Sequence, residues 1–73
     1  MISEYYEQGF NDCRRMMQMN AGEAAFKAME YAGRIRDHLS TRKRDSDEQL
    51  HYYQGYMAAY VRLVSPYAQD QEG

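Results

Sequence analysis

The sequence predicts an all-α protein, because two long segments carry apolar residues at helical spacing. An apolar residue recurs at every third or fourth position from Ile2 to Leu39. Residues 50–64 are more apolar still: on a helical wheel of about 100° per residue, their apolar side chains fill an arc of roughly 200°. A surface helix typically has an apolar stripe only a little over about 100° wide. We therefore expect the helix over 50–64 to be central and to touch two neighbours.

The length and the cysteine content predict one small domain that needs support from another chain. A single core in a chain of 73 residues contributes only a few kcal/mol. Cys13 is the one cysteine, so the chain cannot form an internal disulfide. We assign residues 1–66 to one helical domain and residues 67–73 to a flexible acidic tail. Oligomerisation or binding to a larger protein is then the expected source of additional stability.

The first segment predicts one long helix over about residues 3–39. Ser3 is a candidate N-cap, and Glu4 and Glu7 follow it in the turns where the helix dipole favours anions. The apolar series has repeated spacings of 4, 4 and 3, an eleven-residue pattern close to the pitch of a straight helix. No proline interrupts the series.

Residues 20–22 leave an alternative open. Asn20 and Glu23 match a capping box that would begin a second helix. Gly22 would weaken a continuous helix by about 1 kcal/mol. The apolar series keeps its phase across this point, however, and this favours the long helix. If the chain breaks at 20–22, the fold is instead a three-helix bundle.

A further helix is expected over about residues 46–64. Ser46 and Gln49 fit the S-x-x-Q capping box, and the two residues between them are acidic, as the positive end of the helix dipole favours. Pro66 ends this helix, because the residue before a proline avoids the helical conformation.

These two helices predict an antiparallel hairpin that assembles as a homodimeric helical bundle. The short connection makes them neighbours, and the second helix is long enough to cover only the back half of the first. Apolar side chains in the front half then have no partner in their own chain, and a two-fold homodimer would bury them. The residues assigned to this dimer interface are Tyr6, Phe10, Cys13, Met17 and Tyr56.

A second apolar stripe on the first segment is a candidate surface for binding another protein. It consists of Met19, Gly22, Phe26, Met29 and Gly33, with spacings of 3, 4, 3 and 4. Methionines beside a phenylalanine and glycines make an adaptable surface that accepts a helix or loop of a partner. The same stripe would also suit a core or a dimer interface. Since tyrosine is common at interfaces, the residues assigned to protein binding are Met19, Phe26, Met29, Tyr53 and Tyr60.

A basic run keeps nucleic-acid binding open as an alternative. Five of the residues in 34–44 are basic, and we assign contact with an anion such as phosphate to Arg42, Lys43 and Arg44. A transcriptional regulator would use this segment. The net charge of −2 disfavours a general nucleic-acid binder, and cations near a helix C-terminus also complement the helix dipole.

The sequence contains no pattern typical of an enzyme. His38 and His51 lack the spacing of metal ligands, and Cys13 lies on the apolar stripe, where a nucleophile is not expected. We find no glycine-rich phosphate loop and no Ser/His/Asp set. We therefore expect no catalysis, no cofactor and no metal. A single cysteine, no secretion signal and no apolar run of about 20 residues predict a cytoplasmic protein that does not enter a membrane.

Two short segments are similar to each other. Residues 6–10 and 52–56 both fit Y-x-Q-G-[FY]. A glycine that precedes an aromatic residue on a helix can let a second backbone approach closely, although coincidence in a chain rich in tyrosine and glutamine explains the match equally well.

With these segments, its small size and its lack of a catalytic motif, the chain resembles the small single-domain proteins that bacteriophages encode. Such proteins often block a host protein by direct contact. The resemblance implies a protein-binding module that occupies a surface of a larger host protein as an inhibitor or regulator. A purely structural subunit that self-assembles is a further alternative.

Overall fold

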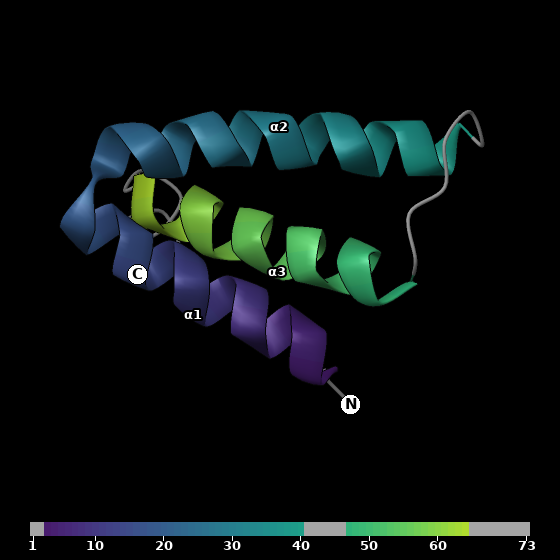
Figure 1. Cartoon of the computed structure of the whole chain (residues 1–73), viewed down its shortest axis with the longest axis horizontal. Helices are drawn as coiled ribbons and strands as arrows, with labels where there is room; N and C mark the ends of the chain where they lie inside the picture. The colour runs from purple at the N-terminus through teal and green to yellow at the C-terminus, as the bar shows by residue number, and fades with distance from the viewer. Residues whose placement is uncertain (1–2, 41–46, 65–73) are drawn as a thin grey trace, which may run out of the picture.

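The computed structural model describes residues 3–40 and 47–64, which form three helices and no strand. α1 spans Glu4–Met19, α2 spans Ala21–Leu39 and α3 spans Asp47–Val64. In Figure 1, α1 and α3 run in the same direction and α2 runs in the opposite one. The all-α class is confirmed. The expected tail over 67–73 and the capping residue Ser46 lie outside the described residues.

The single long helix expected over 3–39 is wrong, and the alternative with a break at 20–22 is correct. Asn20 has an extended backbone, with φ −159° and ψ 92°, and it caps both helices. Its N–H donates to the carbonyl of Met16 at 2.7 Å, which closes α1. Its Oδ1 accepts from the N–H of Glu23 at 3.1 Å, which begins α2. One residue therefore satisfies backbone groups at two helix ends.

The continuous phase of the apolar series was misleading at the start of α2. Ala24 and Ala28 are buried, as the series predicts, but Ala21 and Ala32 belong to the same series and are exposed. The buried side of α2 instead continues to Tyr31, which packs against the core. α1 and α2 each turn an apolar side towards α3, and apolar sides that share a phase in the sequence do not require one continuous helix.

Replacing Asn20 with alanine is expected to lower the free energy of unfolding by about 1 kcal/mol, because the side-chain cap of α2 is lost. Urea unfolding followed by circular dichroism measures this. The control is Asn11→Ala in the exposed middle of α1, where alanine is the better helix former and no loss is expected. Equal stability of the two variants would contradict the capping role of Asn20.

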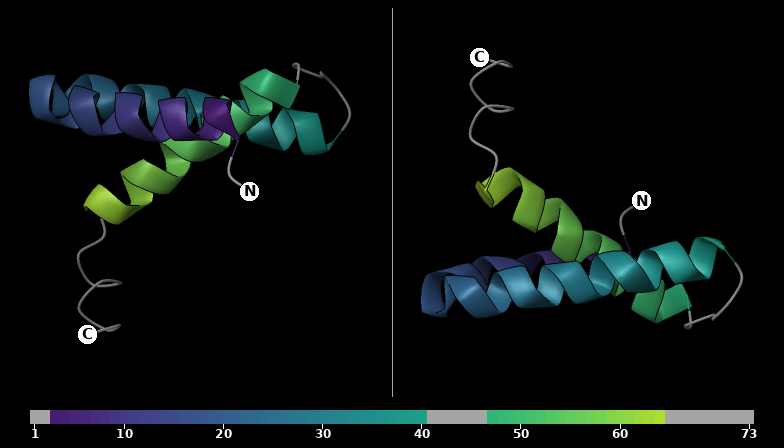
Figure 2. Two further views of the ribbon diagram at one scale, coloured as in Figure 1. Left: turned by 90° about the horizontal axis from the view of Figure 1, so that it is seen from below. Right: turned by 90° about the horizontal axis from the view of Figure 1, so that it is seen from above.

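α3 is the central helix, as expected from its wide apolar arc. It contacts α1 most extensively and α2 to a lesser extent, while α1 and α2 contact each other least. The buried apolar residues come from all three helices: Cys13, Ala24, Ala28, Tyr53, Tyr56 and Ala59. Figure 2 shows that α3 crosses the other two helices at an angle, so that its C-terminal end projects from one face of the pair.

Two glycines allow α1 and α3 to cross in direct backbone contact. A Cβ atom on Gly9 would overlap the carbonyl oxygen of Tyr52, and a Cβ atom on Gly55 would overlap the carbonyl oxygen of Tyr6. These are the glycines and the leading tyrosines of the two Y-x-Q-G-[FY] segments. Each segment thus supplies the glycine that receives the backbone of the other. The close approach suggested by the sequence pattern is confirmed.

Candidate protein-interaction surface

The outer side of α2 carries two of the most exposed large apolar side chains of the described helices. We call Gly22, Phe26, Met29 and Gly33 the outer stripe. Phe26 is 66% exposed and Met29 is 77% exposed. At about 100° per residue, this stripe lies roughly opposite the buried Ala24 and Ala28 on the helix wheel. The stripe therefore faces away from α1 and α3.

Met19 is also exposed, at 72%, and it is the last residue of α1. It immediately precedes the cap residue Asn20, so the reversal of the chain leaves its side chain on the surface. Met19, Phe26 and Met29 are accessible, as their predicted role in protein binding requires, and that role stays a prediction.

Tyr53 is not available to a partner protein, so its assignment to the binding surface is corrected. Its side chain is buried, and its ring stacks on that of Tyr31 with centroids 4.6 Å apart. Tyr60 is half-buried and packs against the core cluster. The wheel placed both residues on the apolar side of α3, but it could not distinguish a side that faces α2 from one that faces solvent.

The residues assigned to a dimer interface are largely occupied within the single chain. Cys13 is fully buried and Tyr56 is 2% exposed, so neither can line a contact between copies of this fold. Phe10 and Met17 pack against the same core cluster. The backbone of Tyr6 lies against Gly55. The premise that these side chains lack a partner in their own chain is wrong, because the reversal at Asn20 brings α1 against α3.

The residues assigned to contact with an anion, Arg42, Lys43 and Arg44, lie outside the described residues.

A polar contact holds α1 to α3 on one side of the core. The hydroxyl of Tyr52 donates to Asp12 Oδ2 at 2.6 Å, and Arg15 donates to Asp12 Oδ1 at 2.6 Å. Burial, together with this hydrogen bond, raises the pKa of Tyr52 above its ordinary value. Each oxygen of the Asp12 carboxylate thus accepts one hydrogen bond, and the bond from Tyr52 joins α1 to α3.

The surroundings of Cys13 do not favour a reactive thiolate. Burial raises the pKa of Cys13, so the neutral thiol is favoured. This fits the expectation that Cys13 is a small packing residue.

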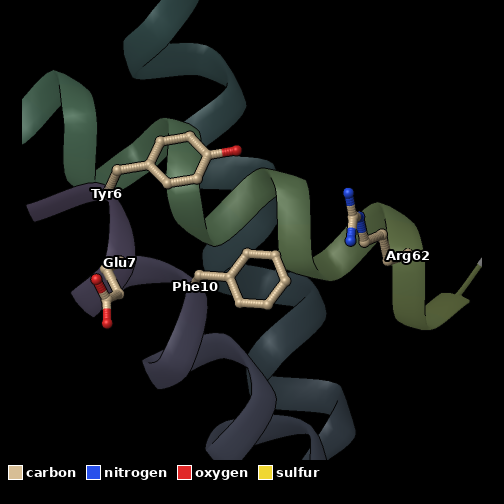
Figure 3. Close-up of a pocket in the computed structure, with 4 residues that line it drawn as sticks. All are labelled: Tyr6, Glu7, Phe10 and Arg62. Carbon is tan, nitrogen blue, oxygen red and sulfur yellow. The ribbon is translucent and has the colours of Figure 1, made fainter. Parts of the chain in front are cut away.

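A shallow hollow of about 290 Å³ lies between α1 and α3, lined by Tyr6, Glu7, Phe10 and Arg62. Figure 3 shows Phe10 pointing from α1 towards Arg62 on α3. The guanidinium carbon of Arg62 lies 5.9 Å from the centre of the Phe10 ring, within the range of a cation–π contact. The cation that borders the hollow is therefore already used in joining the two helices.

Three exposed residues at the end of α3 were not anticipated. Val61, Leu63 and Val64 are 52%, 47% and 44% exposed. The sequence predicts only that this helix is central and touches two neighbours, whereas the C-terminal end of α3 projects away from the face of the α1–α2 pair (Figure 2).

Among residues 3–40 and 47–64, no three His, Cys, Asp or Glu side chains gather in a way that could bind a metal ion. None of the described helices has both the length and the apolar character needed to cross a bilayer. Comparison with known protein families, curated proteins and solved structures found no match to this chain.

Proposed function

We propose that this protein is a protein-binding module that acts by occupying a surface of a larger protein, with the outer side of α2 as its contact surface. The observation that supports the proposal is the exposure of Phe26 and Met29, at 66% and 77%, on the side of α2 opposite the core. Aromatic residues and methionine are enriched in the buried centres of protein interfaces. Covering a functional surface is sufficient for inhibition or regulation, the role that the resemblance to bacteriophage proteins implies.

Site-specific photocrosslinking in bacterial cells tests this function. A photoreactive phenylalanine analogue replaces Phe26 in one variant and Asn11, an exposed residue of α1, in the control. Position 26 is expected to give an adduct heavier than two copies of the 8.6 kDa chain. Position 11 is expected not to give it.

A second substitution distinguishes specific binding of a partner protein from its chance proximity to position 26. Adding Met29→Asp to the position-26 variant places a charge on the contact surface and is expected to reduce the heavy adduct at least tenfold, because a buried charge without a partner is costly. Circular dichroism checks that the helices are retained. The proposal fails if positions 26 and 11 give the same adducts, or if Met29→Asp leaves the heavy adduct unchanged.

A further inference from the structure

The outer stripe contains two glycines that the fold of one chain does not explain. Gly9 and Gly55 are required where α1 and α3 cross. A Cβ atom on Gly33 would meet nothing within 4 Å, and one on Gly22 would meet only Asn20 Oδ1, at an ordinary 3.5 Å. Gly33 lies in the interior of α2, where glycine is destabilising relative to alanine. Elsewhere in this protein, helical glycine marks the place where another helix backbone approaches.

The spacing of the outer stripe reads the same in both directions. Gly22, Phe26, Met29 and Gly33 are separated by 4, 3 and 4 positions. A two-fold axis between residues 27 and 28, perpendicular to α2, places Gly22 opposite Gly33 of a second copy. It also places Phe26 opposite Met29 of that copy, a favourable sulfur–aromatic pair. The stripe is thus complementary to itself in an antiparallel arrangement, the condition for a two-fold interface.

The charged residues beside the stripe satisfy the same symmetry. Glu23, Lys27, Glu30 and Arg34 repeat the 4, 3, 4 spacing one position further along. In an antiparallel pair with this axis, the row faces the same row of the other copy. Glu23 then lies near Arg34 of the second copy, and Lys27 lies near Glu30. The axial offset of each pair is about 3 Å, two residues at ~1.5 Å rise. Each of these two pairs joins an acidic side chain of one copy to a basic side chain of the other.

We propose that two copies of this protein pair through antiparallel α2 helices, with the outer stripe at the centre of the contact. The glycines specify a helix as the occupant, and the self-complementary spacing and charges specify α2 of a second copy. The homodimer expected from the sequence is thereby assigned to a different surface. This pairing covers the face that the proposed function gives to a larger protein, so self-association and partner binding would exclude each other.

Light scattering on the purified full chain, over a concentration series, tests the pairing. The mass is expected to rise towards 17.2 kDa, twice the 8.6 kDa of one chain. Gly33→Leu fills the contact and is expected to weaken dimerisation at least tenfold while retaining the helices. Asn11→Leu, the same kind of enlargement on exposed α1, is expected to leave the dimer intact.

Charge-reversal variants test whether the two α2 helices pair in the antiparallel arrangement. Glu23→Arg alone puts two basic residues opposite each other in its homodimer, and Arg34→Glu alone puts two acidic residues there. Each variant is expected to dimerise at least tenfold more weakly than the native chain, whereas an equal mixture forms a heterodimer with native-like affinity. A mixture no tighter than the separate variants overturns the antiparallel pairing.

The outcomes also separate this inference from the proposed function. A native chain that stays monomeric at all concentrations overturns the pairing, even if position 26 still gives the heavy adduct in cells. A dimer disrupted by Gly33→Leu supports the pairing, even if no heavy adduct forms and the proposed function fails.

Discussion

The Gly55→Ala variant is expected to be severely destabilised. The added methyl group would overlap the carbonyl oxygen of Tyr6 and lie 2.7 Å from its carbonyl carbon and 2.9 Å from its Cα. These are backbone atoms, so no side-chain rotation can relieve the overlap, and α1 and α3 would have to separate. A cost of about 3 kcal/mol or more is expected, the upper end for overpacking. Domains of this size have total stabilities of only roughly 4–10 kcal/mol.

Thermal and urea unfolding, followed by circular dichroism, measure this loss. The matched control is Gly33→Ala on α2, where the added methyl group meets nothing within 4 Å. At concentrations low enough for monomers, that variant is expected to be more stable than the native chain by up to about 1 kcal/mol. The same substitution therefore has opposite effects at the two positions. A Gly55→Ala chain that unfolds within a few degrees of the native chain would contradict the backbone contact.

The second large effect is expected in alkaline solution and depends on Tyr56. Burial raises the pKa of Tyr56 from its model-peptide value of 10.0 to about 12. Well below pH 10 the hydroxyl is neutral in both the folded and the unfolded state, so its contribution to the free energy of unfolding does not change with pH. Between pH 10 and 12 the unfolded chain ionises first. The free energy of unfolding is therefore expected to fall by roughly 1.4 kcal/mol per pH unit because of Tyr56, or by about 2.7 kcal/mol between pH 10 and pH 12.

The matched variant is Tyr56→Phe. The Tyr56 hydroxyl is buried and has no hydrogen-bond partner among the described residues. Removing it is therefore expected to leave stability at pH 7 unchanged or to increase it slightly. Urea unfolding at pH 8, 10 and 11 should show a shallower alkaline loss in the variant. A loss remains, because burial also raises the pKa values of Tyr31 and Tyr52. Identical slopes for the two proteins would rule out Tyr56 as the source.

The helical content of the chain could be predicted from periodicity and capping residues, but the path between the helices could not. Ser3 caps α1 as expected, accepting from the N–H of Tyr6 at 3.1 Å. At Asn20 the local capping signal competed with the unbroken apolar series, and the capping signal was the correct guide. A series with constant phase shows only that two segments have apolar sides. Whether the chain reverses between them is decided by the backbone of one residue.

The candidate surface could be predicted in part, for a related reason. The exposed Phe26 and Met29 form a stripe with its own spacing, separate from the alanines that face the core, and the sequence distinguishes these two sides of α2. α3 is apolar on most sides, so its sequence does not tell buried Tyr53 from exposed Val61. That distinction comes from the angle at which α3 crosses its neighbours, which Gly9 and Gly55 help to set.

The dominance of the α1–α3 contact has a consequence for the biosynthesis of the protein. The helix made first has its most extensive contacts with the last of the three, and the residues in backbone contact are more than forty positions apart in the sequence. While α3 is still being translated, α1 and α2 lack the element that buries their apolar sides. The nascent chain therefore passes through a stage with exposed apolar surface, at which aggregation and chaperone binding compete with folding.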